Sequence, residues 1–323
     1  MATCAKNRTT GMSFTFTAYQ PAHADTWNRF NQSSRNGTFL FDRGYMDYHA
    51  DRFTDASILI EKEGQLLAML PASREGSTVV SHGGLTFGGL ILGDKSGAAD
   101  VKAIFEQLKD WLMVSGVTKF IYKPVPHIYH RMPSEEDLYA LHRLGAKTTR
   151  VDVSTTIQQS ARLPLAKGRK HAIGKAKKAG ITVQKSEDFA SFWQMLTHNL
   201  ADRHAVKPTH SVEEMQLLAS RFPQIQLFMA YLADQPVAGV VVYDYAQVTH
   251  TQYIGLTDVA RETGALDALL EHLISDAFAH RPYFNFGIST CNRGLSFNEG
   301  LAAQKEMFGG RTSILQWLEL ELT

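Results

Sequence analysis

The chain has 323 residues, 44% of them hydrophobic and 20% charged, which is enough for about two globular domains with substantial cores. Its 33 Lys+Arg nearly balance its 32 Asp+Glu, so the overall charge favours no particular class of partner. Two cysteines, Cys4 and Cys291, exclude a disulfide framework and a zinc ribbon, and the lack of a membrane-length apolar run or a signal-peptide core predicts a cytoplasmic protein.

The first half of the chain alternates predicted strands and helices. Residues 13–20 alternate polar and apolar side chains, as a strand does, and two apolar runs flank Glu63-Gly64, as in a β-hairpin. Apolar residues then recur at helical spacing from Val101 to Leu112, and Gly116 marks the end of that helix. The other expected elements are helices over 22–33 and 44–53, an extended run over 79–93, a strand over 119–126, a helix capped by Ser134 with Asp137, and a strand over 149–157.

The second half repeats this order of elements. It contains helices over 188–204 and 212–221, strands on either side of Asp234-Gln235, a third strand over 247–256, a helix over 265–278, a strand over 283–289, a helix over 294–307 and a strand over 312–320. The match is one of element order, without residue identity. It predicts an α/β (α+β) fold of two tandem domains, 1–157 and 158–323, each a mixed, mostly antiparallel sheet flanked by helices.

This order resembles the GNAT acyltransferase fold. In that fold the third strand and the strand after the central helix splay apart, pantetheine lies between them, and the pyrophosphate of acyl-CoA caps the central helix. The resemblance implies acyl-CoA as the donor and assigns Arg261, Gly264 and Ala265 of the segment ARETGAL to the loop that binds it. Leu266 departs from the last small residue of the family's loop pattern.

A basic segment joins the two halves. No acidic residue occurs between Val153 and Ser186, a span that contains eight lysines and arginines. If residues 165–179 are helical, Lys170 and most of the other cations share one face, whereas Arg169 lies on the apolar face and needs an anionic or carbonyl partner. The segment is read either as a solvated linker helix or as a phosphate cradle for a cofactor, a nucleotide-linked glycan or a tRNA.

Two further segments resemble FemAB-type transferases. The run RKHAIGKAKKAGITV is similar to the family's R-x-x-I-x-K-A-x-x-x-G-I, and FNFGISTCNRGLSFNEGLAAQKEMFGGR is similar to its closing block, through Asn298 and Lys305 among others. The resemblance implies transfer of an acyl or aminoacyl group to an amine of a cell-envelope or polysaccharide precursor. Two departures are the missing helical arm that grips tRNA in larger members and Asn285, where many relatives have Asp before Phe-Gly.

Acyl transfer to an amine needs a base, an oxyanion donor and an acid for the leaving group. The family match makes Lys305 a candidate for contact with substrate phosphate or the tetrahedral intermediate, and the alternative is a helix-end lysine favoured by the helix dipole. His250 and His210 are candidate bases, Tyr253 is a candidate acid, and either His250 or Tyr253 could instead be a core residue. Candidate contacts to a phosphorylated or nucleotide-linked acceptor are Arg169, Lys170, Lys207, His127, Tyr129 and Asn298.

Other chemistries lack the residues they need. No metal is expected, because His127 and His130 have no third ligand nearby, and the Walker-like GGLILGDKS is broken by Asp94. The sequence therefore predicts an acyl-CoA-dependent N-acyltransferase. Two alternatives remain open, an aminoacyl-tRNA-dependent FemAB-type transferase and a non-catalytic module whose basic helix binds anions or nucleic acid.

Overall fold

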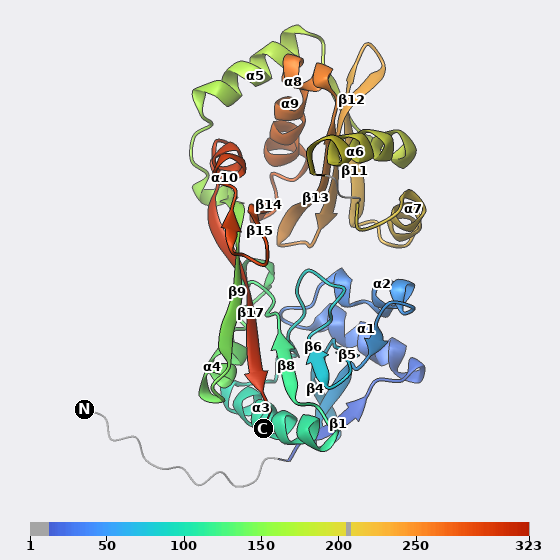
Figure 1. Ribbon diagram of the computed structural model, residues 1–323, viewed down its shortest axis with the longest axis vertical. Coiled ribbons are helices and arrows are strands. Elements are labelled where there is room, and N and C mark those ends of the chain that lie inside the picture. Colours follow the sequence, from blue (N-terminus) through green and yellow to red (C-terminus); the bar gives the residue numbers. More distant parts are fainter. Residues whose placement is uncertain (1–12, 205–207, 323) are drawn as a thin grey trace, which may run out of the picture. The chain divides into compact units, whose positions relative to one another are not determined.

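The computed structural model describes residues 13–204 and 208–322 (Figure 1). The chain forms two compact units, unit 1 from Met1–Arg150 with Gln316–Thr323, and unit 2 from Val151–Leu315. Each unit contains a mixed, mostly antiparallel sheet flanked by helices, as the sequence predicted. The last strand, β17 (Arg311–Glu321), begins in unit 2 and ends in unit 1.

Unit 1 has two groups of strands, in the orders β1-β3-β4-β7 and β17-β8-β6-β5-β2. Only β6 and β8 pair in parallel among these described strands. The strands are β1 (Thr15–Ala18), β2 (Thr54–Asp55), β3 (Ile58–Lys62), β4 (Gln65–Leu70), β5 (Ser73–Glu75), β6 (Thr78–Val80), β7 (Ile91–Leu92) and β8 (Lys119–Tyr122). The helices are α1 (Ala24–Ser33), α2 (Arg43–Met46), α3 (Ala98–Val114) and α4 (Glu136–Arg143).

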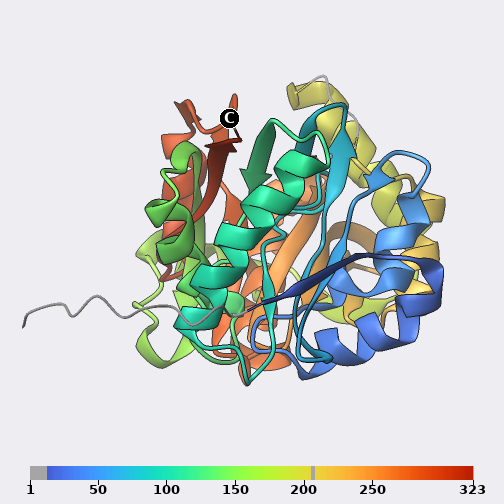
Figure 2. The same cartoon turned by 90° about the horizontal axis from the view of Figure 1, so that it is seen from below.

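The core of unit 1 follows the predicted periodicities. Glu63 and Gly64 both have positive φ, 51° and 74°, as the tight hairpin turn between β3 and β4 requires. The apolar side of α3, with Val101, Ile104 and Leu108 fully buried, packs on the same core as β3 and β4. Figure 2 shows α3 lying across the strands of this unit.

Unit 2 has the strand order β10-β11-β12-β13-β14-β9-β17. The strands are β9 (Lys147–Gln158, entering from unit 1), β10 (Thr182–Ser186), β11 (Ile225–Leu232), β12 (Gln235–Asp244), β13 (Val248–Leu256) and β14 (Tyr283–Ile288), and a small hairpin is formed by β15 (Thr290–Cys291) and β16 (Ser296–Phe297). The helices are α5 (Lys167–Lys178), α6 (Phe189–His204), α7 (Val212–Arg221), α8 (Asp258–Thr263), α9 (Ala265–His272) and α10 (Glu299–Glu306). The core lies between α9 and the inner faces of β11, β12 and β14.

The expected helix over 44–53 is wrong in its length. The α-helix ends at Met46, and a 3₁₀ turn follows from Asp47 to His49. His49 Nδ1 lies 2.7 Å from the Met46 carbonyl oxygen. In a continuing α-helix this oxygen would accept a hydrogen bond from the backbone amide of Ala50. A side chain therefore replaces the helical hydrogen bond at this point.

The expected capping pair Ser134 and Asp137 is also wrong. The Ser134 hydroxyl donates to the Met132 carbonyl oxygen at 2.9 Å, and α4 begins two residues after Ser134. The Asp137 carboxylate instead accepts a hydrogen bond from the buried Tyr122 hydroxyl at 2.5 Å. Tertiary contact with Tyr122 thus outcompetes local capping.

The expected helix over 294–307 begins later than predicted. Residues 290–297 form the β15–β16 hairpin, whose turn contains Asn292, Arg293 and Gly294, all with positive φ. Helix α10 starts at Glu299, where the Asn298 side-chain oxygen accepts from the Leu301 amide at 2.9 Å.

Candidate functional site

The candidate site lies in unit 2, where two parallel strands separate. β13 and β14 pair over three rungs that end with His250 opposite Asn285. Beyond that rung no further pairs join the two strands, both of which lie in the described chain, and β14 pairs with β9 through a register shift between Asn285 and Ile288. This arrangement is the splay that the resemblance implied for the third strand and the strand after the central helix.

A hydrogen-bond network fixes the state of the His250 imidazole. The Gly287 backbone N–H donates to Asn285 Oδ1 at 2.8 Å, which identifies that atom as the amide oxygen. His250 Nδ1 lies 2.7 Å from the same oxygen and must therefore carry a hydrogen. In the neutral ring this leaves the lone pair on Nε2, which has no hydrogen-bond partner among the described residues. His250 thus has the tautomer of a general base.

The other end of the Asn285 amide is held by β9. Its Nδ2 donates to the Ser154 hydroxyl at 2.9 Å and to the Thr156 hydroxyl at 2.7 Å, and Asn285 is 2% exposed. Both the oxygen and the nitrogen of the Asn285 amide thus form hydrogen bonds to other groups of the protein. Asn285 therefore positions His250 rigidly, although the sequence comparison treated it as a departure from the family pattern.

Burial is the main cause of the low basicity of His250. It lowers the pKa of His250 from 6.5 to about 4, the hydrogen bond to Asn285 opposes this shift, and the charge of Lys305 adds to it. The imidazole is consequently uncharged throughout the neutral pH range.

The same shift predicts a loss of stability in acid. Because the pKa of His250 is about 4 in the folded chain and 6.5 in the reference state, the unfolded chain binds more protons between these values. The free energy of unfolding should therefore fall by about 2–3 kcal/mol as the pH drops from 7 to 4. Urea unfolding of the wild type and His250→Gln at pH 7, 5.5 and 4.5 measures this contribution. Equal acid losses in both proteins would contradict it.

Lys305 is held entirely by protein groups. Its Nζ donates to the carbonyl oxygens of Gly287 and Ile288 at 2.9 and 2.7 Å and lies 3.0 Å from the Ser289 hydroxyl. The side chain is 9% exposed, and burial lowers the pKa of Lys305 from 10.5 to about 8. Gly287 has φ of +73°, a conformation that favours glycine. Because Lys305 binds the Gly287 carbonyl oxygen, it stabilises the turn whose backbone amide donates to Asn285. The structure thus places Lys305 behind the site, with its three donors in use.

Tyr253 follows His250 on β13 and lies close to His210, which precedes α7. His210 Nδ1 is 2.6 Å from the Tyr253 hydroxyl, and the Trp193 ring contacts Tyr253 edge-on with ring centroids 5.2 Å apart. Burial raises the pKa of Tyr253, which keeps its hydroxyl protonated at neutral pH. The two residues that the sequence offered as acid and base therefore form a pair, separate from the His250–Asn285 pair.

The segment expected to bind acyl-CoA is helical. The backbone amides of Arg261 and Gly264 donate to the carbonyl oxygens of Thr257 and Ala260, at 3.4 and 3.0 Å. Arg261 pairs with Asp258 at 2.5 Å, and the next predicted contact, Ala265, is fully buried. These two amides are thus already used within the protein, and the contact of this segment with acyl-CoA stays a prediction.

Helix α5 covers the start of the central helix α9 (Figure 1). A Cβ on Gly264 would lie 2.4 Å from the carbonyl oxygen of Ala172, and Gly264 has φ of +77°. Arg169 Nη1 contacts the Asp267 carboxylate in the first turn of α9 at 2.6 Å and lies over the Phe308 ring. The expected anionic partner of Arg169 is confirmed. The first turn of α9 therefore carries an Arg169–Asp267 ion pair and lies against the carbonyl oxygen of Ala172.

The outer face of α5 remains cationic. Its exposed cations form no ion pair within the described chain, and they are Lys167, Lys170, Lys175, Lys177 and Lys178. The contacts of α5 with α8 and α9 and the burial of Ala176 show that it is packed on unit 2. The predicted candidate Lys207 lies outside the described residues.

Three other predicted substrate contacts belong to other elements of the chain. His127 and Tyr129 belong to unit 1, where His127 is exposed and Tyr129 is buried against the Phe87 ring. Asn298 caps helix α10, as described above. Their roles toward a substrate stay predictions.

The described residues contain neither a metal-binding cluster nor a membrane-spanning helix. No group of three or more His, Cys, Asp or Glu side chains there is arranged to hold a metal ion. In the same part of the chain, every helix is too short or too polar to cross a bilayer.

Comparisons with known proteins agree with this architecture. Residues 165–292 match the family model described as an acetyltransferase (GNAT) domain. Solved structures with a similar fold include FemX (11% identity, 95% of this chain and 97% of that chain covered, TM-score 0.66) and L-PGS from Bacillus licheniformis (13%, 95% and 93%, 0.62). A tandem GNAT protein from the clavulanic acid biosynthesis pathway is also similar (8%, 96% and 99%, 0.50). No curated protein matches the chain in sequence. Residues 165–292 thus match a GNAT domain, and the fold of the whole chain is similar to that of FemX, in agreement with the resemblance stated from the sequence motifs.

Proposed function

We propose that the protein is an N-acyltransferase whose reaction takes place in unit 2, where β13 and β14 separate. The observation that carries this proposal is the His250–Asn285 pair at the last shared rung of the two strands. An amine must lose a proton when it attacks a carbonyl carbon, and its nitrogen becomes more acidic as the new bond forms. A weak base such as His250, with its lone pair on Nε2, then suffices to accept that proton.

The leaving group and the developing charge need further groups. The Tyr253 hydroxyl, kept protonated by burial, is the best-supported acid for the departing oxygen or sulfur. The proposed reaction forms the amide C–N bond, breaks the acyl C–O or C–S bond and moves one proton from the amine to His250 and one from Tyr253 to the leaving group. Lys305 supports this arrangement by holding the turn at Gly287.

For the donor, the surroundings of α9 favour an aminoacyl-tRNA over acyl-CoA. The expected pyrophosphate loop is a helical turn next to the Asp267 carboxylate and the Ala172 carbonyl oxygen. In contrast, α5 presents a row of lysines that form no ion pair with the described residues. The row extends over 12 residues, about 18 Å at 1.5 Å per residue, which suits several successive phosphates of a nucleic acid. The FemX likeness supports the same choice at the level of the fold. An amine of a phosphorylated cell-envelope or polysaccharide precursor remains the proposed acceptor.

Donor binding tests the proposal directly. Filter binding of bulk aminoacyl-tRNA at several salt concentrations should show a Kd that rises steeply with salt. The double variant Lys170→Gln/Lys178→Gln should weaken binding about tenfold and reduce the salt dependence by about 1.5 ions. The matched control is Lys95→Gln/Lys147→Gln, which removes two exposed lysines of unit 1.

The competing donor gives a distinct result. If acyl-CoA is the donor, acetyl-CoA will raise the melting temperature of the chain, and tRNA binding will be equally weak in the α5 variant and the control. Tight tRNA binding without transfer of the amino acid to any amine-bearing acceptor would instead support the non-catalytic module. Either result overturns the proposed function.

A further inference from the structure

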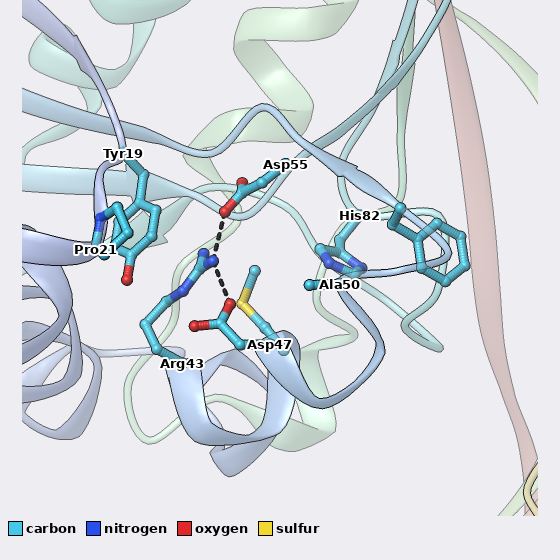
Figure 3. A pocket seen from close by; sticks show the side chains of 9 residues that line it. Tyr19, Pro21, Arg43, Asp47, Ala50, Asp55 and His82 are labelled. Atoms are coloured by element: carbon cyan, nitrogen blue, oxygen red, sulfur yellow. Dashed lines mark hydrogen bonds and ion pairs between the residues drawn. The ribbon is translucent and has the colours of Figure 1, made fainter.

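A pocket in unit 1 has no role in the proposed reaction. It has a volume of about 290 Å³ and is lined by side chains from the end of β1, from α2 and its following turn, and from the loop after β6 (Figure 3). This size is at the lower end of pockets that bind small molecules. All of its lining residues belong to unit 1, so an inference from it does not rest on the function proposed for unit 2.

Two carboxylates surround one buried arginine in this pocket. Arg43, which is 5% exposed, forms ion pairs with Asp47 at 2.5 Å and with Asp55, and its guanidinium lies 3.7 Å from the centre of the Tyr19 ring. Figure 3 shows the guanidinium between the two carboxylates. One positive charge therefore meets two negative charges. The lining has a net charge of −1, which favours a cationic ligand and disfavours an anion.

A buried histidine whose ring nitrogens form no hydrogen bond to the described residues completes the lining, and its ring lies against those of His49 and Phe53. His82 is 4% exposed, its Nδ1 is buried without a hydrogen-bond partner, and neither ring nitrogen bonds to any described residue. In Figure 3 the imidazole lies across the pocket from Tyr19 and Pro21. A buried ring nitrogen that forms no hydrogen bond lowers the stability of the folded protein, so it needs an explanation, and a bound ligand that supplies the hydrogen bond is one.

The backbone at His82 is strained as well. Its φ of +55° is unusual for a residue with a side chain, and such strain persists only where the surroundings enforce it. The next residues supply this enforcement, because a Cβ on Gly84 would lie 2.5 Å from the Phe53 ring and 2.8 Å from the His49 ring. The loop therefore packs too closely for His82 to relax away from the pocket.

Burial keeps the His82 imidazole neutral. It lowers the pKa of His82 to about 3, the charges of His49, Lys123 and Arg43 add to this shift, and the charge of Asp55 opposes it. Burial raises the pKa of Tyr19, and the negative charges of Asp47 and Asp55 add to this effect. His82 can therefore accept a hydrogen bond at one ring nitrogen.

We propose that this pocket binds the alkylammonium group of a small primary amine. The ammonium would donate hydrogen bonds to the carboxylates of Asp47 and Asp55 and to the acceptor nitrogen of His82. Its alkyl stem would lie against the apolar side chains of Met46 and Phe53. A metal ion fits less well, because no metal-binding group of acidic, His or Cys side chains occurs among the described residues.

The test uses the full chain labelled with ¹⁵N at histidine, and the His82 signals are assigned with His82→Gln. Three four-carbon probes of similar size, n-butylammonium, n-butanol and butyrate, are titrated at constant ionic strength. The ammonium should shift the His82 ring nitrogens saturably, and the other two should bind at least about tenfold more weakly. An equal response to butanol, a preference for butyrate or no saturable shift would each overturn the proposal.

Variants of the carboxylates test the charge argument. Asp47→Asn keeps the side chain's shape and should weaken binding of butylammonium about tenfold, and Asp55→Asn should do the same. Asp110→Asn, on an exposed part of α3, is the matched control and should leave the Kd unchanged. Because each of these two variants removes one ion pair of Arg43, the melting temperatures of both are measured first. If Asp55→Asn is unfolded, Asp47→Asn, whose carboxylate is the more exposed of the two, decides. Unchanged affinity in folded Asp47→Asn contradicts the proposal.

Discussion

His250→Gln is expected to lower kcat by about 10²–10⁴-fold, the usual contribution of a positioned general base. Glutamine is similar in size and can still bond to Asn285, but it has no basic nitrogen at the position of Nε2. The melting temperature at pH 7 should therefore change little. Single-turnover transfer from the donor to an amine measures the effect. His280→Gln, at an exposed position of the same unit, is the control and should retain full activity.

The pH profile separates a base from a residue that only shapes the site. In Asn285→Asp a carboxylate replaces the amide oxygen beside His250 Nδ1, and the hydroxyls of Ser154 and Thr156 can rotate to donate to it. The negative charge favours the imidazolium, so the pKa of His250 should rise by about 1–3 units. The acid limb of the kcat profile should then move from near pH 4 toward neutrality. An unmoved acid limb in a folded, active variant would mean that His250 is not the base.

The periodic elements of this chain could be predicted because their causes are local. The turn at Glu63-Gly64 needs positive φ at two successive residues, and the buried side of α3 repeats at helical spacing. The presence of Arg169 on the apolar side of α5 correctly indicated an anionic partner, since a buried guanidinium requires one. The pattern did not show that the partner, Asp267, lies at the start of α9.

Features that depend on distant residues could not be predicted. The end of β17 pairs with β8 in the register Leu318 to Tyr122, and element order along the chain contains no sign of this pairing. Asn285 was visible only as a departure from a family motif, because its contacts come from β9 and from the His250 strand. The alternation in β13 indicated that His250 could be a hydrogen-bonded core residue, but it did not identify Asn285 as the partner. Helical continuity after α2 ended for a local reason instead, because the His49 side chain, three residues along the chain, contacts the Met46 carbonyl oxygen.

Lys305→Met is expected to lower the stability of unit 2 by about 2–4 kcal/mol. The methionine fills a similar volume but leaves the carbonyl oxygens of Gly287 and Ile288 and the Ser289 hydroxyl without their donor. For a chain of this size the melting temperature should fall by about 5–15 °C. The measurement is thermal unfolding at pH 7, below the pKa of about 8 at which the lysine loses its charge.

The activity of the same variant distinguishes two roles for this lysine. If Lys305 acts through the turn at Gly287, Lys305→Arg should recover part of both stability and activity, because a guanidinium can also donate to the two carbonyl oxygens. In Lys305→Met the positive charge that helps to lower the pKa of His250 is gone, so this pKa should rise. The acid limb of the pH profile should therefore shift to higher pH. A normal melting temperature with a kcat/KM about 100-fold lower would show the opposite, that the ammonium leaves its carbonyl partners to contact the substrate. The three satisfied donors of Lys305 make the positioning role the expected result, because a substrate would have to replace hydrogen bonds that are already made.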